Sequence, residues 1–177
     1  FDARTDAPVA APFHSPGKVR DLKLTSDGGR LLLVSEDEAG QSGTPLNAQL
    51  YDAEGARLGT RFALTNFIPE SPTHWIGGIS GTGRRLVIVR GSLTQLWDAE
   101  QGQVLGSPFQ HLNTAGATVS PDGSRAVTYS ETNVFLINAV NGEMITALPH
   151  ENTVDHAEFS PDSLLLVTAC RDNDEKP

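Results

Sequence analysis

A short turn motif returns along this chain at intervals of about 40 residues, and no other sequence feature constrains the fold as much. Ser120–Gly123 reads Ser-Pro-Asp-Gly and recurs at Ser160–Ser163 as Ser-Pro-Asp-Ser. Looser copies stand at Ser80–Gly83, 40 residues before Ser120–Gly123, and at Thr25–Gly28, 55 residues earlier still. A repeat of this length predicts a series of small units, each of which must bury its apolar face against a neighbour.

Each repeat contains the signals of four short strands. An apolar pattern precedes the turn, as in Val154, Ala157 and Phe159, and a β-rich run such as Ala126–Ser130 follows it. A third strand closes each unit with a large apolar residue and a small polar one: Tyr51-Asp52, Trp97-Asp98 and Ile137-Asn138. A glycine turn and an outer strand come next, and no amphipathic helix intervenes. The pattern predicts an all-β fold, a β-propeller of four-stranded antiparallel blades.

The spacing divides the chain into three whole blades and two partial ones, all within one partial propeller domain, 1–177. The whole blades are 14–64, 65–109 and 110–148, while 1–13 reads as the end of a blade and 149–177 as the start of another. A ring of about seven such blades needs roughly 280 residues. We therefore expect open edges that are completed by missing sequence or by another chain.

These repeats resemble the WD-repeat family, in its divergent bacterial type. Trp97-Asp98 is a literal copy of the family's name, and the stretch from His150 through Ser160-Pro161-Asp162 to Asp172 is the longest match. The resemblance implies a buried, structural hydrogen-bond chain of His, Ser or Thr, Asp and Trp in each blade. No blade here has the complete set, so apolar packing should hold the blades. The expected members are His14, Ser35, Asp37, Trp97, His150, Thr168 and Asp172.

The same residues invite a catalytic interpretation, which we weigh against the structural one. They could form a Ser-His-Asp or a Cys-His set, since His150 and Asp172 should meet and Cys170 lies nearby, but Cys170 falls on an alternating strand where a small buried side chain is expected. The five histidines, His14, His74, His111, His150 and His156, are spread over different blades without close ligand spacing. We therefore predict no enzyme, no cofactor and no metal site, although His156 could face the central channel and help to bind a ligand there.

Charge and composition narrow the partners. The formal charge of −9, from 13 basic and 22 acidic residues, opposes binding to nucleic acid. No apolar run is long enough to span a membrane, and a single cysteine excludes a disulfide framework. We therefore expect the chain to contact a protein partner or neighbouring domains of the parent chain. We expect this contact to take place in the cytoplasm.

Two insertions lengthen the repeats, at 38–46 and 65–73. The second carries Phe67, Ile68 and Pro69, an apolar triplet that would suit contact with a partner. Packing of the triplet over the end of a strand is the alternative.

The leading functional hypothesis is a non-catalytic interaction scaffold or sensor region of a larger multidomain protein. Val9–His14 and Gly106–His111 are similar to bacterial WD-repeat regions attached to serine/threonine kinase or signalling ATPase domains. The alternative hypothesis is a propeller enzyme or small-ligand-binding propeller, lactonase-like or periplasmic, with its site in the central channel. Groups converging on that channel would favour the alternative.

Overall fold

A computed structural model describes residues 4–8, 12, 14–15, 17–36, 46–64 and 74–171 of the chain. All regular structure in these residues is β-strand, fourteen strands in total. No helix in this part of the chain could span a bilayer. The partial blade predicted at 1–13 falls largely outside the described residues.

The strands form three four-stranded sheets and one hairpin, with every pairing antiparallel. Within each sheet the strands lie in chain order, so each sheet is a simple meander. The first sheet contains β1 (Val19–Leu24), β2 (Arg30–Ser35), β3 (Asn47–Asp52) and β4 (Arg57–Ala63). The second contains β5 (His74–Ile79), β6 (Arg85–Arg90), β7 (Leu93–Asp98) and β8 (Gln103–Gln110). The third contains β9 (Gly116–Val119), β10 (Arg125–Ser130), β11 (Asn133–Asn138) and β12 (Met144–Pro149), and the hairpin contains β13 (Val154–Phe159) and β14 (Leu166–Cys170).

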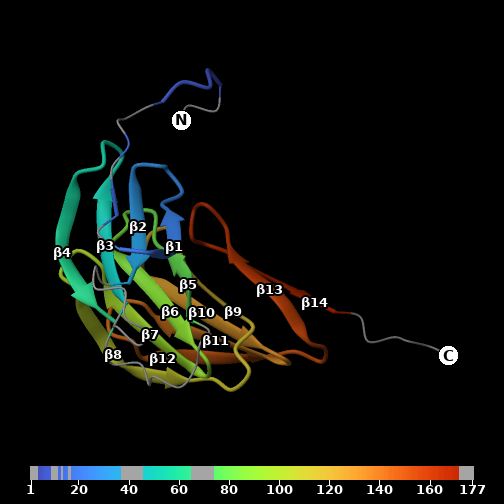
Figure 1. The fold of residues 1–177 in the computed structure, drawn as a ribbon. Coiled ribbons are helices and arrows are strands. Elements are labelled where there is room, and N and C mark those ends of the chain that lie inside the picture. Colours follow the sequence, from blue (N-terminus) through green and yellow to red (C-terminus); the bar gives the residue numbers. More distant parts are fainter. Residues whose placement is uncertain are drawn as a thin grey trace.

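The sheets fan out side by side, with their first strands innermost (Figure 1). β1 contacts β5, β5 contacts β9, and β9 contacts β13. This arrangement confirms the prediction of an all-β, propeller-like array of four-stranded antiparallel sheets. The described sheets do not close into a ring, and the last hairpin extends away from the third sheet (Figure 1).

A separate apolar cluster fills the space between each pair of neighbouring sheets. Leu32 and Val34 of β2 project toward the second sheet, where they meet Leu86, Ile88 and Trp97. Because side chains alternate along a strand, every second residue of β2 serves this interface. The other two clusters repeat the pattern between the second and third sheets and between the third sheet and the hairpin. Burial of these clusters is the main stabilising contribution, as expected for stacked repeats.

The repeated turns owe their shape to a hydroxyl and a carboxylate. In the third sheet, Ser120 Oγ donates to Asp122 Oδ1 at 2.6 Å and accepts from Arg125 N at 2.9 Å. Gly123 then adopts a φ of 74°, which L-residues avoid. In the last turn Ser163 occupies the glycine position with a φ of 64°, so that copy of the turn is strained.

A second repeated feature, a glutamine side chain bonded to the fourth strand, lies at the outer edge of the first two sheets. The side-chain amides of Gln49 and Gln95 donate to carbonyl oxygens of the fourth strand, Leu58 O at 2.9 Å and Leu105 O at 3.3 Å. The next residue in each fourth strand is a glycine of positive φ. At Gly106 the chain passes so close to the turn of the following sheet that an added Cβ would lie 2.5 Å from Asn141 O.

Candidate functional site

The repeated turns form a connected rim at one end of the sheets. Gly81 N donates to Pro121 O at 2.7 Å, and Asp122 N donates to Ser163 Oγ at 3.0 Å. Each of these bonds joins the turn of one sheet to the turn of the next. The rim therefore couples neighbouring blades through the polar groups that the motif supplies.

The aspartate carboxylates of these turns accept hydrogen bonds from their own turns. The pKa values of Asp27, Asp122 and Asp162 are all lowered, first by the hydrogen bond from the Ser or Thr hydroxyl two positions earlier and then by a backbone N–H. These groups are ionised at neutral pH and accept bonds from their own turns. They are poorly suited to act as general acids.

Asp98 is the most buried carboxylate of the second sheet, at 2% exposure. Its Oδ2 lies 3.0 Å from Arg84 Nε and 2.8 Å from an Arg85 guanidinium nitrogen, and its Oδ1 accepts from Gln101 N at 3.0 Å. Burial raises the pKa of Asp98, but these hydrogen bonds outweigh burial and leave the pKa below its usual value. The carboxylate thus fastens the end of β7 to the start of β6.

A buried histidine that is not among the expected network members, His111, lies in the loop between β8 and β9 and packs on the third sheet. His111 Nδ1 is 3.0 Å from Thr128 Oγ1, and Nε2 is 2.6 Å from Ser130 Oγ. The ring also packs edge-on against Phe135, with centroids 4.4 Å apart. Burial lowers the pKa of His111, which favours the neutral ring between two hydroxyls. Its place one repeat before His150 was the signal that could have found it.

The structure brings His150 and Thr168 together. His150 Nε2 lies 2.9 Å from Thr168 Oγ1, and Nδ1 lies 2.9 Å from Leu148 O. Both ring nitrogens are therefore used within the fold. Asp172, the third expected member, lies outside the described residues.

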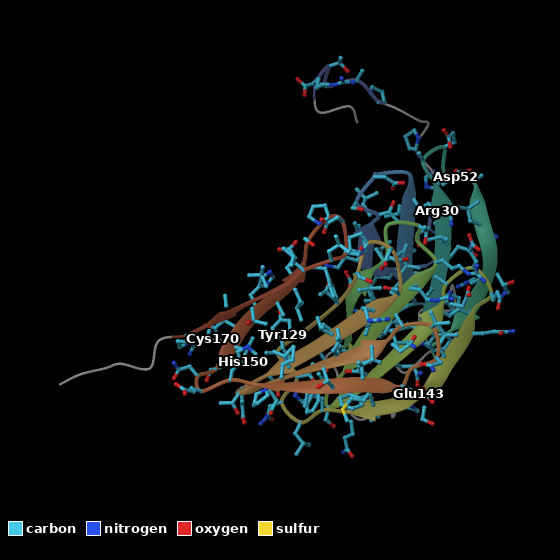
Figure 2. All side chains as sticks on the ribbon, turned by 180° about the vertical axis from the view of Figure 1, so that it is seen from behind. Arg30, Asp52, Tyr129, Glu143, His150 and Cys170 are labelled. Atoms are coloured by element: carbon cyan, nitrogen blue, oxygen red, sulfur yellow. The ribbon has the colours of Figure 1, made fainter. Side chains whose placement is uncertain are left out.

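The expectation that Cys170 is buried is wrong, because its side chain is exposed. It lies at the end of β14, which has no further strand beside it among the described residues. Seen from behind, Tyr129, His150 and Cys170 lie toward the hairpin end of the array, far from Arg30 and Asp52 (Figure 2).

The remaining expected network members are separated. His14 is exposed, whereas Ser35 is buried on β2. Trp97 is buried and stacks on Phe62 with centroids 4.9 Å apart, but its Nε1 has no hydrogen-bond partner among the described residues. The closing tryptophan is thus held by apolar packing. Asp37 and the predicted partner loop, Phe67, Ile68 and Pro69, lie outside the described residues.

A hollow of about 260 Å³ opens where the innermost strands converge. Its walls include Lys23 of β1, Thr118 of β9, Tyr129 of β10, and His156 and Glu158 of β13. His156 Nε2 lies 3.5 Å from Glu158 Oε2, and both side chains are exposed. Burial raises the pKa of Tyr129, so its phenol stays protonated. The hollow offers positive and negative charge to a small polar ligand.

The described residues contain no group of three or more His, Cys, Asp or Glu side chains placed to hold a metal ion. The candidate site therefore consists of the hollow between the innermost strands, which we call the channel hollow, and the rims around it.

Comparison with known proteins bears on the fold. No family model matches the chain, and no curated protein matches it. Among solved structures, 394 chains match, one of which is hydrazine synthase from Kuenenia stuttgartiensis. That match has a TM-score of 0.56 and 17% sequence identity, and it covers 86% of this chain but only 42% of the other. The likeness shows the fold alone.

Proposed function

We propose that this chain is part of a non-catalytic interaction scaffold of the WD-repeat type, within a larger cytoplasmic signalling protein. The proposal rests mainly on one observation: the polar side chains that could have served catalysis make hydrogen bonds within the fold instead. Asp98, His111 and His150 all bond to neighbouring strands or turns, and the turn aspartates bond to their own loops. What remains for function is a rigid frame whose rims present varied loops.

The two rims carry exposed apolar side chains that a partner could cover. Leu112 lies between β8 and β9 at one rim, and Val140 lies between β11 and β12 at the other. Single exposed apolar residues are common on any surface, so they serve here as probe positions.

The proposal is tested by placing a photo-crosslinking amino acid at Leu112 or at Val140 in the parent protein, expressed in its native cells. A scaffold should give one defined polypeptide from one rim, and the other rim provides the matched control. The purified polypeptide should then bind the wild-type chain and bind Leu112→Asp or Val140→Asp more weakly, at the rim concerned. Absence of any cross-linked polypeptide from both rims would contradict the proposal.

The channel hollow favours a second candidate, a ligand-binding propeller. Lys23 and Glu158 both line the hollow and carry opposite charges, which suits a small zwitterion such as an amino acid. Calorimetric titration with the standard amino acids tests this candidate, with Lys23→Ala and Glu158→Gln as variants that should each lose binding. The enzymatic form of the hypothesis is tested by lactone hydrolysis with added divalent cations.

A further inference from the structure

The repeated turn of the second sheet differs from the other copies, because it has no carboxylate. We call Ser80–Arg85 the second turn. Its third residue is Thr82, whereas the third residue of each other copy is an aspartate, namely Asp27, Asp122 or Asp162. It also ends in two arginines, Arg84 and Arg85, whereas the other copies have at most one arginine at these positions. The second turn therefore has one anion fewer and more positive charge than its counterparts.

The second turn lies in the interior of the array, between the turns of the first and third sheets. On one side, Gly81 N donates to Pro121 O at 2.7 Å. On the other side, an added Cβ at Gly83 would lie 2.8 Å from Arg30 Cδ, so the side chain of Arg30 passes directly over that glycine. Residues of this chain thus cover both flanks of the second turn, and its outer surface is exposed at Thr82 and Arg84.

In the other copies, the aspartate carboxylate accepts two short hydrogen bonds within the turn. In the third sheet, Asp122 Oδ1 accepts from Ser120 Oγ at 2.6 Å and from Ser124 N at 2.9 Å. In the second turn the hydroxyl of Thr82 takes the place of the carboxylate, and its contacts are longer. Thr82 Oγ1 lies 3.3 Å from Ser80 Oγ and 3.4 Å from Arg84 N. The donors of the second turn are therefore only weakly bonded.

The ion pairs beside the second turn leave one cation in excess. Glu100 pairs with Arg30 at 2.6 Å, and Asp98 pairs with both Arg84 and Arg85, at 3.0 and 2.8 Å. Arg84 uses only its Nε in this pair, and its side chain is 48% exposed. No hydrogen bond joins the terminal nitrogens of Arg84 to another residue in the part of the chain that the structure describes. These nitrogens are available to a second carboxylate.

We propose that the second turn binds a single carboxylate of a protein partner, an aspartate or glutamate side chain, at the position that an aspartate occupies in the other copies. The carboxylate accepts from the Thr82 hydroxyl, from Arg84 N and from a terminal nitrogen of Arg84, and such charge-assisted bonds are stronger than neutral ones. Asp27 and Asp122 carry negative charge in the flanking turns, so a phosphate dianion or a run of acidic residues fits less well. The inference rests on the proposed scaffold function and names the chemistry of its partner.

The first test follows the backbone amide signals of the chain by NMR while sodium acetate is added at constant ionic strength. Acetate presents one carboxylate and nothing else that the site could recognise. The signals of Thr82, Gly83 and Arg84 should shift and saturate, with a Kd on the order of 10 mM for a few charge-assisted bonds. Sodium chloride should not produce these shifts, and inorganic phosphate should bind more weakly than acetate.

Two variants remove the site, and a third controls for charge. Thr82→Asp supplies the missing carboxylate from the chain itself, so it should abolish the acetate shifts while raising the urea midpoint, which shows that the fold is intact. Arg84→Ala should weaken acetate binding by about tenfold or more. Arg125→Ala removes an exposed arginine beside the turn of the third sheet, where Asp122 already fills the position, and should leave acetate binding unchanged.

Acetate shifts that fail to saturate, that chloride reproduces or that persist in Thr82→Asp would overturn the proposal, as would tighter binding of phosphate. A polypeptide identified by cross-linking separates this inference from the proposed function. Its affinity should fall about tenfold or more in Thr82→Asp. A polypeptide that binds Thr82→Asp as well as wild type would overturn the inference and leave the scaffold function standing. Acetate binding without any cross-linked polypeptide would contradict the scaffold function and, with it, the assignment of the carboxylate to a partner.

Discussion

Replacing Gly106 with alanine should destabilise the array at the outer contact between the second and third sheets. Gly106 has a φ of 69°, and an added Cβ would lie 2.5 Å from Asn141 O in the turn of the next sheet. The left-handed backbone costs an alanine about 1 kcal/mol. Crowding against a backbone atom, which cannot swing aside, adds about 1–3 kcal/mol. We expect a total loss of about 2–4 kcal/mol in the free energy of unfolding.

Gly28 provides a matched control. Its φ is 70°, almost the same as that of Gly106, but an added Cβ would have no atom within 4 Å. Gly28→Ala should therefore show only the backbone cost, about 1 kcal/mol. The difference between the two variants isolates the contact between sheets.

Urea unfolding followed by circular dichroism measures both losses, and for a chain of this size each kcal/mol shifts the Tm by roughly 2–4 °C. Equal losses in the two variants would refute the reasoning. Gly106 would then matter only for its backbone conformation, and the sheets would not be in close contact at Asn141.

Three further predictions concern single polar groups. Burial lowers the pKa of His111, so as pH falls the unfolded chain binds a proton at this residue before the folded chain does. The free energy of unfolding should therefore be constant above about pH 6.5 and decrease as pH falls toward the folded pKa. In His111→Asn, the urea midpoint should change less between pH 7 and 5 than it does in wild type. Asp98→Asn should cost about 3 kcal/mol in urea unfolding, because it leaves the mostly buried Arg85 guanidinium without its carboxylate partner. Arg84→Ala should cost much less, because the Arg84 side chain is half exposed. Ser163→Ala should lower the free energy of unfolding by about 1 kcal/mol, because it removes the acceptor of the bond from Asp122 N. Ser163→Gly removes the same bond but also relieves the positive φ, so its stability should be close to that of wild type. Equal losses of stability in the two variants would contradict this account.

The repeat was enough to predict the strands because it places turn chemistry and apolar alternation at fixed intervals. Ser120, Asp122 and Gly123 specify one turn locally, through bonds that span only a few residues. Antiparallel meanders then follow without any choice of distant partner. Local signals of this kind can be read from a single sequence.

Features that depend on neighbouring sheets could not be predicted in the same way. Cys170 follows an alternation typical of a buried strand, but β14 pairs only with β13 and has no strand on its other side among the described residues, and the Cys170 side chain is exposed. The glutamine and glycine at the outer edge, Gln95 and Gly106, have no distinctive spacing in the sequence. Gln95 acts within its own sheet through its bond to Leu105 O, and the need for glycine at 106 arises from the approach of the turn at Asn141.

Stacked sheets gain stability from their neighbours, so the two ends of such an array are its weakest elements. The hairpin of β13 and β14 packs on one side only, against the third sheet, and its Val167 faces solvent. Any surface that packs on Val167 would therefore stabilise the hairpin directly, and through the bond from Asp122 N to Ser163 Oγ it would also stabilise the turn of the third sheet.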